Sequence, residues 1–190
     1  YKKISAPINP AALSEVFSLQ QHPAILGGND SKSNSDRFSC WMAKPKEIFE
    51  FRAGQKDPFS KLQKTIDKYK LKNRFENKLP KGIFCGGWAG YFGYELGRYI
   101  EKLPAATTDD LRMPLIHLCF YDKVIAYDHI EKTSWVLILQ LPDDTETPQE
   151  KFGWLERLLA DSRKIDLSKP VHADIEPLAL SKIRCNMEKD

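Results

Sequence analysis

The feature that most constrains the fold is a series of apolar, β-branched and aromatic runs in the second half of the chain. These runs lie at residues 83–92, 115–121, 124–128 and 134–141. The last three are separated by connections of hairpin length, which predict an antiparallel meander. We therefore expect an antiparallel sheet at the centre of the fold.

Helical patterns flank these strands. Asn9 and Pro10 are typical of an N-cap and a first helical position, and they predict a helix that ends near Gln21. An Asp-Pro pair at 57–58 predicts the start of a second helix, with the aspartate as N-cap. Between 148 and 164, apolar residues recur at helical spacing, which predicts an amphipathic helix packed on the sheet.

Further strands are predicted in the first half of the chain. Segments 37–43 and 47–52 read as two strands that the turn at 44–46 joins into a hairpin. A short strand is expected at 24–26, before a polar loop at 29–35. Strands grouped around separate helices favour an α+β fold, with antiparallel sheets and flanking helices, over a doubly wound α/β fold.

Composition excludes several classes of protein. A chain of 190 residues can form one compact domain or two small lobes, and its apolar fraction of 42% is typical of a soluble globular protein. No run is long and apolar enough to cross a bilayer, so no membrane contact is expected. The N-terminus lacks the apolar region of a signal peptide, and we expect a cytoplasmic location.

The basic segment from Lys61 to Lys81 does not predict a nucleic-acid site. Leu62, Ile66 and Tyr69 keep helical spacing within it, so its lysines are expected to form a solvated outer face. The net charge of +3 is small, and the aromatic residues that stack on single strands are not interleaved with the lysines. Nucleic-acid binding, which would weaken steeply as salt rises, is the least favoured function.

Metal and nucleophile patterns are weak. The four cysteines are widely spaced and form no CxxC pair, which indicates buried free thiols rather than a zinc site. His117 and Cys119 share one face of a predicted strand, an arrangement more typical of a packed core than of a metal site. Asp128 and His129 are adjacent on a strand and point to opposite faces, so they do not form a hydrolase triad.

The glycine-rich run at 85–101 matches neither a Walker loop nor a dinucleotide-binding loop. Its glycines fall within an aromatic strand, where missing side chains allow close approach of another backbone. Close sheet packing is therefore favoured over ligand contact. Glu95 and Arg98 follow at i, i+3 spacing and predict a local ion pair on a short helix.

Several segments, in order, resemble the component I family of anthranilate synthase and aminodeoxychorismate synthase. They are Asp36–Ser39 with Ala43–Pro45, Gly86–Glu95 with Glu101–Pro104, Met113-Pro114 with Phe120–Asp122, and Val124–His129. The resemblance spans about residues 23–141. It implies an N-terminal α+β domain at 1–165 that packs on a larger C-terminal chorismate-binding domain. Residues 166–190 would be a linker and the start of that domain.

The resemblance also implies a function for the intact protein, which would add ammonia from a glutamine amidotransferase subunit to chorismate. The chain itself would be non-catalytic and hold no cofactor, since Mg²⁺ and the acid/base residues would belong to the C-terminal domain. The run at 90–98 is closer to the aminodeoxychorismate branch, which serves folate and para-aminobenzoate biosynthesis. The anthranilate branch of tryptophan biosynthesis, with a tryptophan feedback site, is the alternative.

The N-terminal region of the family holds a tryptophan pocket, with a Leu-Leu-Glu-Ser-like strand end and an Arg-Tyr-Ser-like start. Here the first part reads Ile-Leu-Gly-Gly at 25–28, and glycines offer an ammonium group only backbone carbonyls. We therefore expect a vestigial structural pocket lined by Phe38 and Ser39. Effector binding would need other acceptors from the loop. The candidate pocket residues are Gly28, Asp30, Ser31, Phe38 and Ser39.

A different class of function is a stand-alone module that binds a small ligand. Such a module predicts a monomer with no broad exposed apolar face, and a melting temperature that its ligand raises. An enzyme part predicts instead an apolar face left uncovered when its neighbouring domain is absent.

Overall fold

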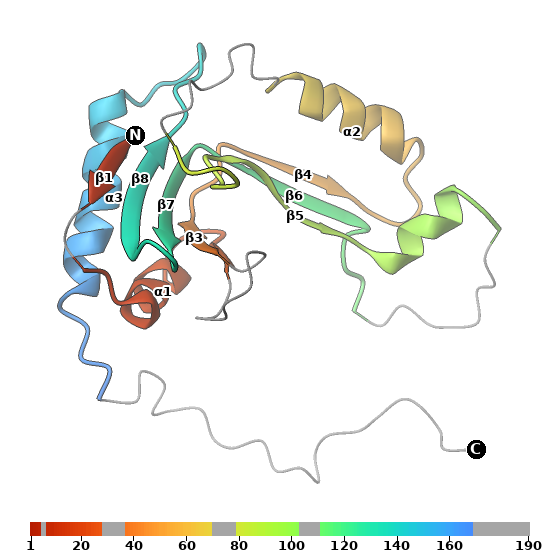
Figure 1. Ribbon diagram of the computed structural model, residues 1–190. Coiled ribbons are helices and arrows are strands. Elements are labelled where there is room, and N and C mark those ends of the chain that lie inside the picture. The colour runs from red at the N-terminus through yellow and green to blue at the C-terminus, as the bar shows by residue number, and fades with distance from the viewer. Residues whose placement is uncertain (5–6, 28–36, 70–78, 103–110, 169–190) are drawn as a thin grey trace, which may run out of the picture.

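Two antiparallel sheets that meet at an angle form the protein in the computed structural model, which describes residues 1–4, 7–27, 37–69, 79–102 and 111–168 (Figure 1). The first sheet has five strands in the order β1-β8-β7-β3-β2, and the second has three in the order β4-β6-β5. The expected α+β class with antiparallel sheets is confirmed.

The helices and strands alternate irregularly along the chain. In order they are β1 (Lys2–Ile4), α1 (Pro10–Ser18), β2 (Ala24–Leu26), β3 (Phe38–Met42), β4 (Glu47–Phe51), α2 (Pro58–Asp67), β5 (Gly87–Phe92), the 3₁₀ helix η2 (Tyr94–Tyr99), β6 (Ile116–Tyr121), β7 (Lys123–Asp128), β8 (Thr133–Ile138) and α3 (Pro148–Ser162). None of the helices in the described part of the chain is long and apolar enough to cross a membrane.

The five-stranded sheet with α1 and α3 forms what we call the five-stranded lobe. One face of the sheet packs on both helices, around Leu13, Phe17, Trp41, Val136 and Leu155. The other face is covered by segment 79–85, and its buried side chains include Cys40, Met42, Val124, Ala126 and Leu137. Both faces of this sheet therefore contribute to the core, because neighbouring residues of a strand point to opposite sides.

Caps hold both helices of this lobe in place. The Asn9 side chain accepts hydrogen bonds from the backbone N–H groups of Ala11 and Ala12 at 3.0 and 3.3 Å, so the predicted N-cap is confirmed. At the start of α3, Thr147 and Glu150 form a reciprocal capping box. The helix starts fixed by these caps set where the apolar stripes of α1 and α3 meet the sheet.

The three-stranded sheet with α2 and η2 forms the three-stranded lobe. One face packs on the helices around Phe51, Leu96, Ile116 and Leu118. On the opposite face Ile48 and Glu50 are exposed, and Tyr91 and His117 are only half-buried. Figure 1 shows α2 along one side of this sheet alone.

The predicted hairpin between β3 and β4 is wrong. β3 pairs with β7 in the five-stranded sheet, whereas β4 pairs with β6 in the three-stranded sheet. Lys44 adopts a left-handed conformation at φ 51°, and the N–H of Lys46 donates to the carbonyl of Phe120 at 2.8 Å. The connection therefore carries the chain from one sheet into the other instead of folding it back.

The predicted meander is wrong in its first half. β7 and β8 form the expected hairpin, but β6 belongs to the other sheet, and only Asp122 separates it from β7. Asp122 is 2% exposed and bonds to the buried Lys151, whereas a hairpin turn would lie at the surface. The sheet-to-sheet crossing therefore lies at a buried ion pair rather than at an exposed turn.

Two local expectations also need correction. Helix α2 begins at Pro58 as expected, but Asp57 lies in a left-handed conformation and its side chain makes no cap hydrogen bond. Strand β5 begins at Gly87, later than predicted. Within it, a Cβ at Gly90 would stand 2.0 Å from the carbonyl oxygen of His117. Glycine is therefore required there by close sheet packing, as the sequence indicated.

Candidate functional site

Ser39, the predicted pocket residue at the start of β3, is buried and has its partners within the fold. Its Oγ lies 2.7 Å from Nε2 of His129, and only 6% of the residue is exposed. Gly27 covers it closely, because a Cβ on that glycine would stand 2.3 Å from the Ser39 Oγ. The hydroxyl of Ser39 therefore faces a histidine and a stretch of backbone.

Phe38 points to the other side of the sheet from Ser39. Its ring joins the cluster around Cys40 and Met42, and the guanidinium of Arg37 lies 4.9 Å from the ring centroid. The remaining predicted pocket residues, Gly28, Asp30 and Ser31, lie outside the described residues. The structure thus brings Ser39 together with His129 and Gly27 rather than with Phe38, and effector binding stays a prediction.

An ion pair fixes the chain beside Ser39. Arg37 Nε lies 3.1 and 3.0 Å from the two carboxylate oxygens of Asp128, and the N–H groups of Ile130 and Glu131 donate to the same carboxylate. Burial opposes ionisation, but these donors hold the pKa of Asp128 below its usual value. The pair anchors the end of β7 and so positions His129. The bond between His129 and Ser39 was not predicted from the sequence.

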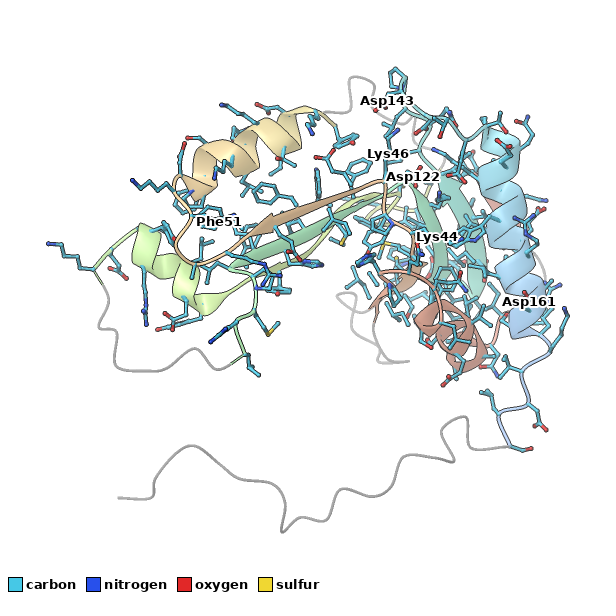
Figure 2. All side chains as sticks on the ribbon, turned by 180° about the vertical axis from the view of Figure 1, so that it is seen from behind. Lys44, Lys46, Phe51, Asp122, Asp143 and Asp161 are labelled. Carbon is cyan, nitrogen blue, oxygen red and sulfur yellow. The ribbon has the colours of Figure 1, made fainter. Side chains whose placement is uncertain are left out.

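A second polar group lies where the two sheets join, and we call it the junction charge cluster. Its members are Lys46, Asp122, Lys123, Asp143, Asp144, Glu146 and Lys151. Figure 2 shows Lys46, Asp122 and Asp143 gathered at the crossing between the lobes. These residues come from four separate stretches of the chain, so no single sequence motif predicts the cluster.

Lys151 is the centre of the junction charge cluster and is completely buried. Its Nζ lies 2.6 Å from Asp122 Oδ2 and 2.7 Å from the carbonyl oxygen of Leu139, and it also bonds to Asp144. Burial favours the neutral carboxyl, yet the Leu141 N–H, Lys151 and Lys46 lower the pKa of Asp144 to about 2. These bonds tie α3 to both crossings between the lobes.

A cavity of about 370 Å³ opens beside this cluster, lined also by Lys44, Pro45 and Thr145. The lysines and carboxylates around it are mostly bonded to one another. Lys46 bonds to Asp143 and Asp144, and Lys123 pairs with Glu146. The arrangement is suited to holding the lobes together, since each of its three lysines is paired with at least one carboxylate of the cluster.

Cys119, His117 and Glu50 form a row on the less covered face of the three-stranded sheet. The Cys119 Sγ lies 3.5 Å from His117 Nε2, and His117 Nδ1 lies 3.0 Å from Glu50 Oε1. The order matches a nucleophile, base and orienting acid, but burial raises the pKa of the Cys119 thiol, which disfavours the thiolate. In the described ranges, no three His, Cys, Asp or Glu side chains converge as metal ligands.

Comparison with known proteins identifies the family. The model of the chorismate binding enzyme family matches residues 27–182. The chain belongs to this family. It is 37% identical over 119 residues to anthranilate synthase alpha subunit 2, chloroplastic, of Arabidopsis thaliana, covering 60% of this chain. It is 35% identical over 75 residues, or 40% of this chain, to aminodeoxychorismate synthase component 1 of Bacillus subtilis.

The chain covers only a small share of these relatives, 19% of the Arabidopsis protein and 16% of the Bacillus protein. A crystal structure of anthranilate synthase component I from Streptococcus pneumoniae resembles this structure with a TM-score of 0.55 and 21% identity. The likeness covers 88% of this chain and 38% of that chain. This likeness confirms the fold.

Proposed function

We propose that the chain is the N-terminal, non-catalytic part of an enzyme that aminates chorismate. The observation that carries the chorismate-aminating activity is the family match over 27–182, together with relatives that are named synthases of anthranilate or aminodeoxychorismate. The N-terminal, non-catalytic role rests on the resemblance of residues 23–141 to the N-terminal region of the component I family. The ammonia would come from a glutamine amidotransferase subunit. Residues 1–165 would form the N-terminal domain, and 166–190 would lead into a C-terminal chorismate-binding domain.

The described side chains support a structural role for this part. The acids and bases that resemble catalytic groups are engaged within the fold: Asp128 with Arg37, Ser39 with His129, and Lys151 with two aspartates. A catalytic acid or base must instead reach its substrate. We therefore assign chorismate binding, Mg²⁺ and the proton transfers to the C-terminal domain.

Two branches of the family remain as candidate activities. The aminodeoxychorismate branch is favoured by the sequence of 90–98 and by the Bacillus relative. The anthranilate branch is favoured by the longer match to the Arabidopsis protein, at similar identity. The two have comparable support, so the product of the reaction must decide between them.

The deciding experiment uses the full-length protein, incubated with chorismate, Mg²⁺ and an ammonium salt. Mass spectrometry of the product, and its conversion by a lyase, would separate a 4-aminated chorismate from anthranilate. A 4-aminated product assigns the aminodeoxychorismate branch, and anthranilate assigns the other. If the folded protein leaves chorismate unchanged, the proposed function is wrong.

A tryptophan titration of the same protein tests the pocket at Ser39. Because Gly27 and His129 already occupy the surroundings of the Ser39 hydroxyl, we expect tryptophan to leave the melting temperature unchanged. A rise that grows with tryptophan concentration would show that the loop before β3 completes an effector site.

A further inference from the structure

Cys119 and His117 occupy the face of the three-stranded sheet that lies opposite α2 (Figure 1). Their side chains point to the same side because they are two residues apart on β6. On this face His117 lies between Glu50 of β4 and Tyr91 of β5, its partners in the strand registers. The sequence favoured a packed core for the Cys–His pair, but the His117 side chain is 26% exposed. The pair therefore lies at the boundary between the core and the surface.

The distance within the pair is that of two ligands on one metal ion. Cys119 Sγ lies 3.5 Å from His117 Nε2. In a tetrahedral zinc site, a thiolate sulfur at about 2.3 Å and an imidazole nitrogen at about 2.0–2.1 Å from the metal stand about 3.5–3.6 Å apart. The spacing of the two atoms therefore needs little change for both to bind the same ion.

Glu50 orients the imidazole for this role. His117 Nδ1 lies 3.0 Å from Glu50 Oε1, and the tautomer protonated at Nδ1 donates to that oxygen. Nε2, which faces Cys119, then carries the lone pair that a metal ion needs. Arg52 bonds to the other oxygen of Glu50 at 3.0 Å, and Arg52 and His117 lower the pKa of Glu50. The carboxylate thus stays ionised, as in the carboxylate–histidine pairs that support bound zinc.

The donor types decide which ion suits the pair. Thiolate sulfur and imidazole nitrogen suit zinc and softer metals, whereas Mg²⁺ and Ca²⁺ prefer oxygen ligands. Burial raises the pKa of the Cys119 thiol, so the metal must displace the thiol proton, which passes to solvent. Among the described residues, no third His, Cys, Asp or Glu ligand joins the pair. Water or a donor from another molecule would fill the remaining tetrahedral positions.

We propose that Cys119 and His117 bind a zinc ion as its two protein ligands, with Glu50 as the carboxylate that orients the imidazole. The inference does not depend on the proposed function, because it uses only contacts within the three-stranded sheet. With half the ligands of a structural zinc site, the pair should bind zinc with a dissociation constant on the order of 10 µM. Bound zinc should also raise the melting temperature, since the unfolded chain lacks the arranged pair.

Zinc titration of the full-length protein, with Mg²⁺ in excess, tests the inference. Calorimetry should detect one zinc ion that Cys119→Ser removes, because serine keeps the approximate size of the side chain but lacks the ligand sulfur. The matched control is Cys40→Ser, which changes a cysteine of similar burial in the five-stranded sheet. The control should leave zinc binding unchanged. Melting curves without zinc show whether each variant is folded.

Co²⁺ in place of Zn²⁺ identifies the sulfur ligand directly. Co²⁺ should give a thiolate-to-cobalt charge-transfer absorption in the wild-type protein, and Cys119→Ser should abolish it. Glu50→Gln should keep the absorption but weaken metal binding about 10–100-fold, because it removes the charge that supports the imidazole. The matched control is Glu47→Gln on the same strand, where the glutamate bonds to Tyr69 instead. This control should leave the dissociation constant unchanged.

Three outcomes overturn the inference. Equal zinc stoichiometry and affinity in the wild-type and Cys119→Ser proteins would show that zinc binds elsewhere. Absence of the charge-transfer absorption at saturating Co²⁺ would show that no thiolate is a ligand. If Cys119→Ser does not fold, the glutamate variants decide, since equal dissociation constants for Glu50→Gln and Glu47→Gln would contradict the site. None of these results bears on chorismate turnover, so the two proposals fail separately.

Discussion

The two lobes are built from similar strands but differ in how completely their sheets are covered. The five-stranded sheet buries side chains on both faces, with α1 and α3 on one side and segment 79–85 on the other. The three-stranded sheet has helices on one face only and exposes Ile48 and Glu50 on the other. Because burial of apolar surface is the main stabilising force, we expect the five-stranded lobe to carry most of the stability.

The difference also extends to the polar groups of the two lobes. The five-stranded lobe holds the Ser39–His129 contact and the Arg37–Asp128 pair, in which Ser39 and Asp128 are buried and Arg37 is partly exposed. In the part of the chain that the structure describes, the three-stranded lobe leaves Ile48 and Glu50 exposed. Among the described residues, the five-stranded sheet is therefore covered on both faces and the three-stranded sheet on one face only.

The largest expected effect lies between the lobes, at Lys151. Lys151→Met would leave Asp122 and Asp144 without their buried partner, and we expect a loss of about 3–5 kcal/mol in the free energy of unfolding. Urea denaturation of the two proteins measures this loss. The matched control is Lys164→Met, because that lysine pairs with Asp161 at the surface and should contribute less than about 1 kcal/mol. Equal effects of the two substitutions would contradict a central role for the junction charge cluster.

Truncation of one buried phenylalanine in each lobe compares their cores directly. Phe17 and Phe51 are both completely buried. Phe17→Ala should cost about 3–5 kcal/mol because two helices and a sheet enclose the cavity, and Phe51→Ala should fall at or below the low end of that range. Denaturant unfolding checks the order, and a larger loss for Phe51→Ala would reverse the comparison.

The pH dependence of unfolding tests the junction charge cluster by another route. The pKa of Asp144 is lowered from 3.8 to about 2, so its ionised form stabilises the folded protein above the unfolded pKa. That contribution, about 2 kcal/mol, should be lost as pH falls from about 4 toward 2. Urea unfolding across this pH range measures it. Asp144→Asn should flatten the curve there, and an unchanged curve would contradict the assignment.

Local sequence signals predicted the elements well but not their partners. Pro10, Pro58 and Pro148 each begin a helix at the predicted position, because proline fits the first turn wherever the helix later packs. The β7–β8 hairpin was equally predictable. Both errors of strand pairing, by contrast, fall at one place, where β3 passes to β4 and β6 passes to β7.

The reason is that these connections look like turns in the sequence while serving as crossings in space. The segment Lys44-Pro45-Lys46 has the composition of an exposed turn. Aspartate, the residue type at position 122, is common in turns. Their roles depend on Lys151 and Asp144, which arrive from distant positions in the chain. Ser39 could likewise be predicted from the sequence as a pocket residue. Its neighbours His129 and Gly27 could not be predicted, because they come from distant positions in the chain.

One consequence of the two crossings concerns the synthesis of the protein. β3 and β7 are neighbours in the five-stranded sheet, yet the whole three-stranded lobe lies between them in the chain. The three-stranded lobe is thus an insertion, entering and leaving its host sheet at adjacent strand ends. During synthesis, β3 must wait for the entire insertion to leave the ribosome before its partner β7 appears, which makes this pairing a late step of folding.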